Sequence, residues 1–427
     1  MYKYKIKFIA LSDTVAFEIK SEVKEIVEAF VEDILMIFTR IDANEKFVIE
    51  SLQKNSPEVG QKIELFTDKY KKDLPQLNKI SAYFRKLKDN EPFFFLPGIQ
   101  SENIDNLKLH DYLRATEEGK SFEELNKQTT DLFGELMKKY QIRVYGDKRI
   151  NIGEPVKSKR VCRFCNNEKP NISFDSKAHA ISEGLGNKTI VLYDECDICN
   201  SDFSKAVEQD IIQYLSLFRT IYDVKGKGGS KMFDGQNFNL KKEENVVLSF
   251  NSDEERPEPF SMPYIVTLKA KHPIVLQNIY KTLCKYFLSV IDAEHLPHFK
   301  KTIDWINGNI QIENLPKIGE MISYHSFAIQ PRIVTYIRTD EDTDLPFAVG
   351  ELYFTCKLFV FIIPLSSKDN KDFTDKLDFE KYWETFQHYK KSKGWTFMNY
   401  SNNKPKEFAI NLNFTLNEKP NIPTSKE

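Results

Sequence analysis

Apolar residues in the first part of the chain recur with two different periods. Residues 2–8 alternate between apolar and charged side chains, which predicts a half-buried strand. Helical spacing follows over residues 21–38, and the capping box at 121–124 precedes a second helical pattern. The aromatic run 91–98 favours a loop that fills a core over a loop that binds a partner. We therefore expect a mainly helical N-terminal domain with an initial strand over residues 1–150.

From about residue 245 onward, strand and helix patterns follow one another. A helix is predicted from Pro273, where the missing amide donor of proline costs nothing, and a second one stops at Gly308. Strands are predicted at 246–250, 264–268, 321–330, 332–338, 348–356, 358–364 and 408–415, with a further helix near 378–391. This order favours an antiparallel sheet with helices on one face, so the fold class is α+β. The domain spans 245–416, and we expect the polar tail 417–427 to be disordered.

The middle of the chain contains a shorter pattern. Residues 173–193 predict a strand, a glycine turn and a second strand at 189–193. A helix is then predicted from Asn200, because apolar residues recur every three or four positions, at Phe203, Val207, Ile211, Leu215 and Phe218. So small a strand-strand-helix unit, within residues 151–225, cannot bury enough surface alone and needs a metal to stabilise it.

Four of the six cysteines flank this unit and predict that metal. They form two C-x-x-C pairs, which supply four soft ligands for a tetrahedral zinc ion: Cys162, Cys165, Cys196 and Cys199. A pair of disulfide-linked hairpins is the alternative, and it requires an oxidising compartment. The start of the chain has no secretion signal, so we expect a cytoplasmic protein with structural zinc. The two remaining cysteines, Cys284 and Cys356, lie in apolar sequence and are expected in the core.

Between and after the cysteine pairs lie Ala178-His179, the turn 184–187 and Cys199-Asn200. With two C-x-x-C pairs around them, these residues resemble the zinc-binding branch of the HNH (ββα-metal) endonuclease family. The resemblance covers about 45 to 60 residues. It implies a central ββα-metal unit between the two larger domains, and a metal-dependent endonuclease that hydrolyses phosphodiester bonds.

The resemblance also assigns roles to single residues. His179 takes the position of the general base, Asn200 that of a metal ligand on the helix, and Asn187 that of the asparagine orienting the catalytic loop. The catalytic ion is expected to be magnesium or manganese, distinct from the zinc, because oxygen ligands suit these ions. Simpler roles stay open: His179 packing beside zinc, Asn200 capping the helix, and Asn187 occupying a left-handed turn.

One position departs from the family pattern. Many members carry an acidic residue before the catalytic histidine as a second metal ligand, whereas this chain has Ala178. The carboxylate could come instead from Asp175, Glu183, Asp194 or Asp202. Glu183 and Asp202 are favoured because they lie close to His179 and Asn200 in sequence. The departure also leaves open a catalytically inactive zinc-ribbon module that binds nucleic acid or protein.

Basic residues near the unit are candidates for phosphate contacts. They are Arg163, Lys188, Arg219, Lys225, Lys227 and Lys231, the last three in a glycine-rich loop without P-loop spacing. A solvated linker is an equal alternative for that loop. The formal net charge of the chain is only −2, so any nucleic-acid-binding surface must be local. No apolar run is long enough to span a membrane.

Together these features predict a DNA endonuclease, with RNA as an alternative substrate. The resemblance favours a regulated effector in bacterial antiphage defence, in which the flanking domains restrain the nuclease. In that setting we expect a sensor or regulatory protein as a partner, or a homo-oligomer. The alternative is a nuclease subunit that is active only within a complex.

Overall fold

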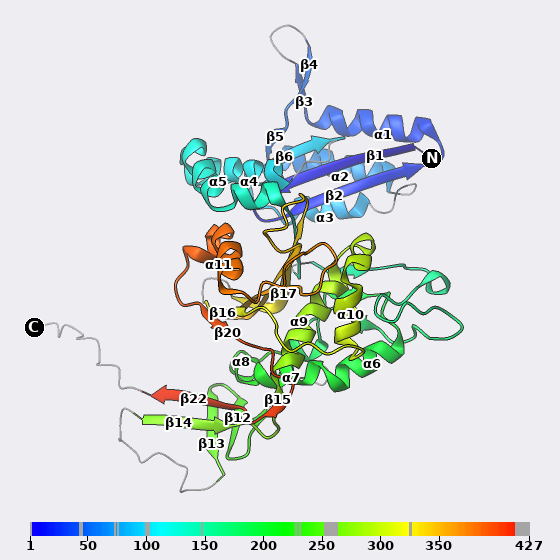
Figure 1. The fold of residues 1–427 in the computed structure, drawn as a ribbon. Coiled ribbons are helices and arrows are strands. Elements are labelled where there is room, and N and C mark those ends of the chain that lie inside the picture. The colour runs from blue at the N-terminus through cyan, green and yellow to red at the C-terminus, as the bar shows by residue number, and fades with distance from the viewer. Residues whose placement is uncertain are drawn as a thin grey trace, which may run out of the picture. The chain divides into compact units, whose positions relative to one another are not determined.

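The computed structural model describes residues 2–41, 46–71, 74, 77–98, 103–146, 148–226, 229, 232–251, 264–323 and 327–414. The predicted tail 417–427 lies outside these residues. The chain divides into two compact units: residues 1–139 with 386–388, and residues 140–385 with 389–427. Both contain helices and antiparallel strands (Figure 1), in agreement with the α+β class.

The first unit is built on a four-stranded antiparallel sheet. Its strand order is β2 (Thr14–Ser21), β1 (Tyr2–Ala10), β6 (Pro92–Pro97) and β5 (Leu52–Lys54). Strand β1 confirms the alternating pattern, and β6 is the aromatic run. Phe93 and Phe95 are fully buried, and the Phe95 ring lies 4.3 Å from that of Phe38. The run therefore fills the core, as a strand and not as a loop.

Helices complete the first unit: α1 (Lys24–Ile37), α2 (Pro57–Tyr70), α3 (Asn78–Phe84), α4 (Asn103–Glu118) and α5 (Phe122–Lys139). The pattern at 21–38 corresponds to α1, and the capping box at 121–124 precedes α5. A small hairpin, β3 (Thr39–Ile41) with β4 (Phe47–Ile49), follows α1. The expectation of a mainly helical region with one strand missed the rest of the sheet.

The second unit is centred on a six-stranded antiparallel sheet. Its order is β20 (Thr396–Met398), β16 (Ile318–Ile322), β19 (Lys357–Ile362), β18 (Ala348–Thr355), β17 (Ala328–Arg338) and β7 (Tyr140–Tyr145). The helix predicted from Pro273 is α9 (Leu276–Val290), which begins after the short strand β15 (Ile274–Val275). It packs on β17 and β18, and Tyr280 donates a 2.8 Å hydrogen bond to the Ile362 carbonyl.

Smaller elements surround this sheet. A three-stranded sheet consists of β8 (Ile150–Ile152), β10 (Ile190–Leu192) and β9 (Ala178–His179), and another of β11 (Phe233–Asp234), β12 (Phe238–Lys242) and β13 (Val246–Phe250). Strand β14 (Tyr264–Lys269) pairs with β22 (Ala409–Phe414), and β15 with β21 (Pro405–Lys406). The remaining α-helices of this unit are α6 (Asp197–Ala206), α7 (Glu208–Tyr214), α8 (Ser216–Ile221), α10 (Lys300–Ile306) and α11 (Lys376–Thr385). The residues of α12 (Gln387–Lys390) are divided between the two units.

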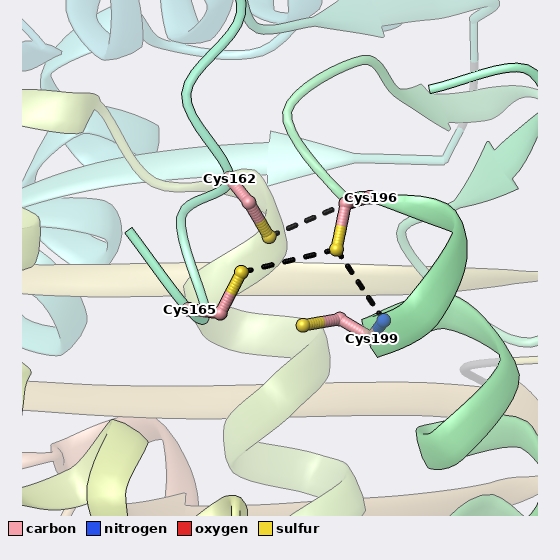
Figure 2. Close-up of side chains that lie close together, drawn as sticks. All are labelled: Cys162, Cys165, Cys196 and Cys199. Atoms are coloured by element: carbon pink, nitrogen blue, oxygen red, sulfur yellow. Dashed lines mark hydrogen bonds between the residues drawn. The ribbon is translucent and has the colours of Figure 1, made fainter. Parts of the chain in front are cut away.

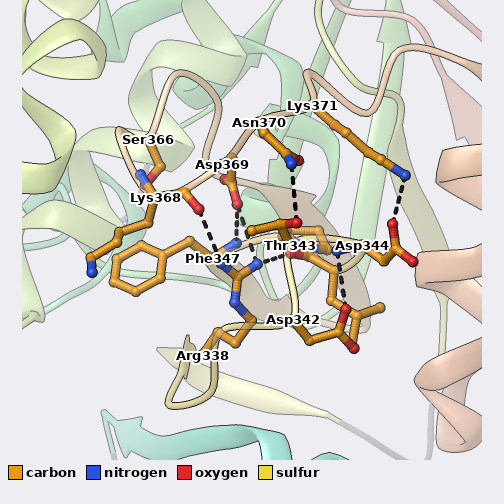
Figure 3. A network of polar contacts seen from close by, with 12 residues as sticks. Arg338, Asp342, Thr343, Asp344, Phe347, Ser366, Lys368, Asp369, Asn370 and Lys371 are labelled. Carbon is orange, nitrogen blue, oxygen red and sulfur yellow. Dashed lines mark hydrogen bonds and ion pairs between the residues drawn. The ribbon is translucent and has the colours of Figure 1, made fainter.

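A buried arginine at the end of β17 fixes the loops beside it (Figure 3). Arg338 is 4% exposed and donates to the carbonyl oxygens of Leu345 and Lys368, while its charge faces Asp369 at 3.5 Å. Burial raises the pKa of Asp369 to about 7, although Phe347 and Arg338 both stabilise its charged form. These contacts hold two loops against each other at one end of the sheet.

The strand-strand-helix segment and the C-terminal region share one unit, unlike the predicted division at residues 225 and 245. Helix α9 is the reason, because twelve of its residues are buried and it contacts α7 as well as the sheet. Thr282, for example, donates a 3.1 Å hydrogen bond to the Val207 carbonyl. One apolar cluster consequently includes residues from Cys162 to Tyr400. None of the described helices is long and apolar enough to cross a membrane.

Candidate metal centre and adjoining cleft

The four predicted cysteines lie together in the second unit (Figure 2). All four are free thiols, and their sulfur atoms lie within 4.8 Å of one another. Cys165 Sγ is 3.8 Å from Cys196 Sγ, and the Cys196 amide points at Cys162 Sγ over 3.5 Å. A hydrogen bond from Cys199 lowers the pKa of the Cys162 thiol to about 5.

This geometry fits a tetrahedral metal ion. Zinc–sulfur bonds of about 2.3 Å place the four sulfur atoms about 3.8 Å apart, far beyond the length of a disulfide. The cluster could therefore hold a metal such as zinc. One C-x-x-C pair lies in the turn after β8, and the other begins α6, where Cys196 is the N-cap residue.

Buried polar contacts fix the first cysteine pair to the helices behind it. Arg163 donates to the carbonyl oxygens of Leu288 and Ile291 at 2.8 and 3.3 Å, and pairs with Asp194 at 3.3 Å. Its side chain is only 3% exposed, so it is a structural residue and does not provide the phosphate contact predicted from the sequence.

His179 lies on β9, where it pairs with Val191 of β10. Burial lowers the pKa of the imidazole, although Glu183 partly opposes this effect, so the ring is neutral near neutral pH. Its Nδ1 atom is buried and has no hydrogen-bond partner among the described residues. A buried nitrogen without a protein partner leaves a position for a water molecule or a ligand.

Asn187 organises the turn between the two strands. It is fully buried, and its amide nitrogen donates to the carbonyl oxygens of Ile181 and Ile190 at 2.8 and 3.0 Å. Its oxygen accepts from the amides of Thr189 and Ile190. The left-handed residue of the turn is Gly186, with φ of 83°, and not Asn187. Asn187 therefore orients the loop from the inside, and it is not among the residues that line the adjoining cleft.

Asn200 lies inside α6, which begins at Asp197, so it is not the cap of the helix. It shares a cleft of about 860 Å³ with His179. We call this the histidine cleft; it is lined by Ser176, Lys177, His179, Ser182, Glu183, Gly184, Lys188, Asn200, Ser204, Glu208, Gln209 and Ile212. The structure thus brings together the predicted residues His179, Asn200, Glu183 and Lys188.

Other candidates lie elsewhere. Asp202 is exposed on α6 and does not line the cleft, in contrast to the prediction that it lies beside His179 and Asn200. Asp194 pairs with Arg163 instead. Arg219 is only 8% exposed, so it does not form the surface phosphate contact that was expected. Lys225 is exposed, and its loop packs on the turn at Glu183. Lys227 and Lys231 lie outside the described residues.

A buried ionic group that the sequence did not predict adjoins the cleft, and one of its members, Glu208, lines it. Lys285 of α9 lies 3.1 Å from a carboxylate oxygen of Glu195 and 3.1 Å from one of Glu208. It also donates a 3.4 Å hydrogen bond to the His179 carbonyl. Burial raises the pKa of Glu195 to about 7, although Lys285 opposes it. We call Glu195, Glu208 and Lys285 the buried triad.

A signal for Glu208 was present in the sequence. Asn200, Ser204, Glu208 and Ile212 follow one another at steps of four residues, and all four line the cleft. Extending the helical face from Asn200 would have identified Glu208. No comparable signal exists for Lys285, which comes from a helix in which twelve of fifteen residues are buried.

Comparison with known proteins identifies no relative: no family model, no curated protein and no solved structure matches the chain.

Proposed function

We propose that this protein is a metal-dependent endonuclease that hydrolyses phosphodiester bonds, with DNA as the expected substrate. The observation that carries the proposal is the position of His179 and Asn200 in one cleft, directly beside a four-cysteine cluster. Lys177 and Lys188 also line the cleft and suit contacts to phosphate oxygens. RNA is the alternative substrate, because contacts to the backbone distinguish little between nucleic acids.

The chemistry follows from the residues of the cleft. The neutral imidazole of His179 takes a proton from the attacking water, and Asn187 keeps the neighbouring turn in place. The amide oxygen of Asn200 and a carboxylate of the cleft are hard ligands that suit magnesium or manganese. When bound, such an ion would stabilise the charge that develops on the phosphate and the leaving oxygen.

The setting is part of the same proposal and is supported by the resemblance to HNH enzymes alone. We expect a cytoplasmic effector in bacterial antiphage defence whose cleavage is regulated, either by a sensor partner or by formation of a homo-oligomer. Free cysteines in a zinc cluster agree with a reducing compartment.

The substitution His179→Ala tests the function. Cleavage of supercoiled plasmid, single-stranded DNA and RNA with magnesium or manganese should fall by about 10²–10⁴-fold, because the general base is lost. Metal content and melting temperature should stay unchanged. The control is His272→Ala, which removes an exposed histidine outside the cleft and should cleave like the wild type.

The pH dependence gives a second readout of the same experiment. Since the pKa of His179 lies below its ordinary value, cleavage should be constant above about pH 6.5 and fall up to tenfold per pH unit below the lowered pKa. Equal activity of His179→Ala and wild type would exclude His179 as the base. A wild-type protein that cleaves nothing would favour the inactive zinc-binding module, or a subunit that requires its complex.

A further inference from the structure

The histidine cleft has a carboxylate on its helical wall. Asn200 and Ser204 of α6 and Glu208 of α7 line it at steps of four residues, and thus lie on one side of two consecutive helices. The residue before His179, where many members of the HNH family carry an acidic side chain, is the buried Ala178. Glu208 therefore offers the cleft a negative charge that the strand does not provide.

The position of the Glu208 carboxylate is tightly fixed. Its side chain is 9% exposed, and Oε1 lies 3.1 Å from the ammonium nitrogen of Lys285. The other oxygen, Oε2, has no partner among the described residues. Carboxylates that bind metal ions are commonly oriented in this way, with one oxygen held by a neighbouring donor and the other free to coordinate.

The charge balance of the buried triad also favours a cation beside Glu208. Lys285 carries one positive charge, whereas Glu195 and Glu208 together carry two negative charges when both are ionised. A buried excess of negative charge is unfavourable, and either a proton on Glu195 or a bound cation would compensate it. Glu195 is completely buried beside Cys196, whereas Glu208 lines the cleft, so the compensating ion would bind at Glu208.

We propose that Glu208 is the carboxylate ligand of the catalytic divalent cation and that Lys285 is its positioning residue. The inference rests on the proposed nuclease function and replaces the acidic residue that is missing at position 178. Lys285 also holds the carbonyl of His179, so one ammonium group fixes both the base and the ligand. Glu183, the rival carboxylate in the cleft, is partly exposed and has no such support.

The test measures manganese binding directly. Isothermal titration calorimetry of the full, zinc-loaded chain with MnCl₂ compares the wild type, Glu208→Gln and Glu183→Gln. Because glutamine can still accept a hydrogen bond from Lys285 but has no charge, Glu208→Gln should raise the dissociation constant at least about tenfold. The matched control is Glu168→Gln, an exposed carboxylate outside the cleft, which should bind as the wild type does.

The outcomes separate this inference from the proposed function. If Glu208→Gln binds manganese within twofold of the wild type while His179→Ala abolishes cleavage, the nuclease stands and Glu208 is not the ligand. If the wild type neither binds manganese nor cleaves, both proposals fail. Should Glu208→Gln not fold, Glu208→Asp is titrated instead, since it keeps the charge opposite Lys285. Tenfold weaker binding by that variant supports the proposal, and unchanged binding overturns it.

Discussion

The cysteine cluster and the wall of the histidine cleft are neighbours, yet they are specified in different ways. All four cysteines come from two short segments, a turn and the start of α6, so their spacing along the chain already predicts the site. The cleft wall depends on Lys285, which lies 77 residues after Glu208 and 90 after Glu195. A metal cluster can thus be encoded locally, whereas the charge of a cleft depends on how distant elements pack.

The largest effect is expected from substituting a cysteine of the four-cysteine cluster. Cys196→Ser removes one sulfur ligand and the sulfur that accepts from the Cys199 amide, so stoichiometric zinc should be lost. Structural zinc contributes about 10–16 kcal/mol of apparent binding free energy in small zinc domains. Loss of the zinc should therefore lower the melting temperature strongly. Metal analysis and thermal unfolding measure both quantities.

The control for this variant is Cys284→Ala, which removes a buried thiol outside the cluster. It should keep its zinc and lose only about 1 kcal/mol of stability, as core truncations of this size do. A Cys196→Ser protein that retains one zinc ion per chain would show that the four sulfurs do not form the site.

The next largest effect should come from substituting Lys285, which is distant in sequence from the carboxylates that it pairs with. Lys285→Met leaves two buried carboxylates without their cation, which should cost about 3–5 kcal/mol in the free energy of unfolding. Zinc content should be unchanged, because no cysteine contact is lost. Urea denaturation measures the loss, with the exposed Lys300→Met as the control that should change stability by less than about 0.5 kcal/mol.

A double variant sharpens this result. Adding Glu208→Gln to Lys285→Met removes one of the two stranded charges and should restore part of the lost stability. If Lys285→Met unfolds within about 1 kcal/mol of the wild type, the triad does not carry the charges that its geometry implies.

Much of the fold was readable from periodicity. The alternating residues 2–8, the helix of α9 and the strands at 246–250 and 264–269 agree with their patterns, because each is a local consequence of side-chain spacing. The helix predicted from Asn200 breaks instead at Val207, with φ of −122°. Residues 197–221 contain no glycine or proline, so no local signal marks that break.

The errors share a physical cause. Residues 92–97 are apolar throughout because β6 lies inside a sheet that is covered by helices, and such a run does not alternate. Arg163 and Arg219 were expected at the surface because they are charged, but tertiary contacts bury both. Composition gives the sign of a charge, and only packing decides whether it meets solvent.

The smallest of these effects is expected from substituting Asn187, which makes its hydrogen bonds within one turn. Asn187→Ala removes two donated and three accepted hydrogen bonds within the turn that leads to β10, so stability should fall by about 1–3 kcal/mol. Cleavage should fall less than in His179→Ala, because Asn187 acts through the loop. Thermal unfolding and plasmid cleavage are compared with those of Asn171→Ala, an exposed asparagine. A loss of cleavage equal to that of His179→Ala at unchanged melting temperature would place Asn187 among the reacting groups.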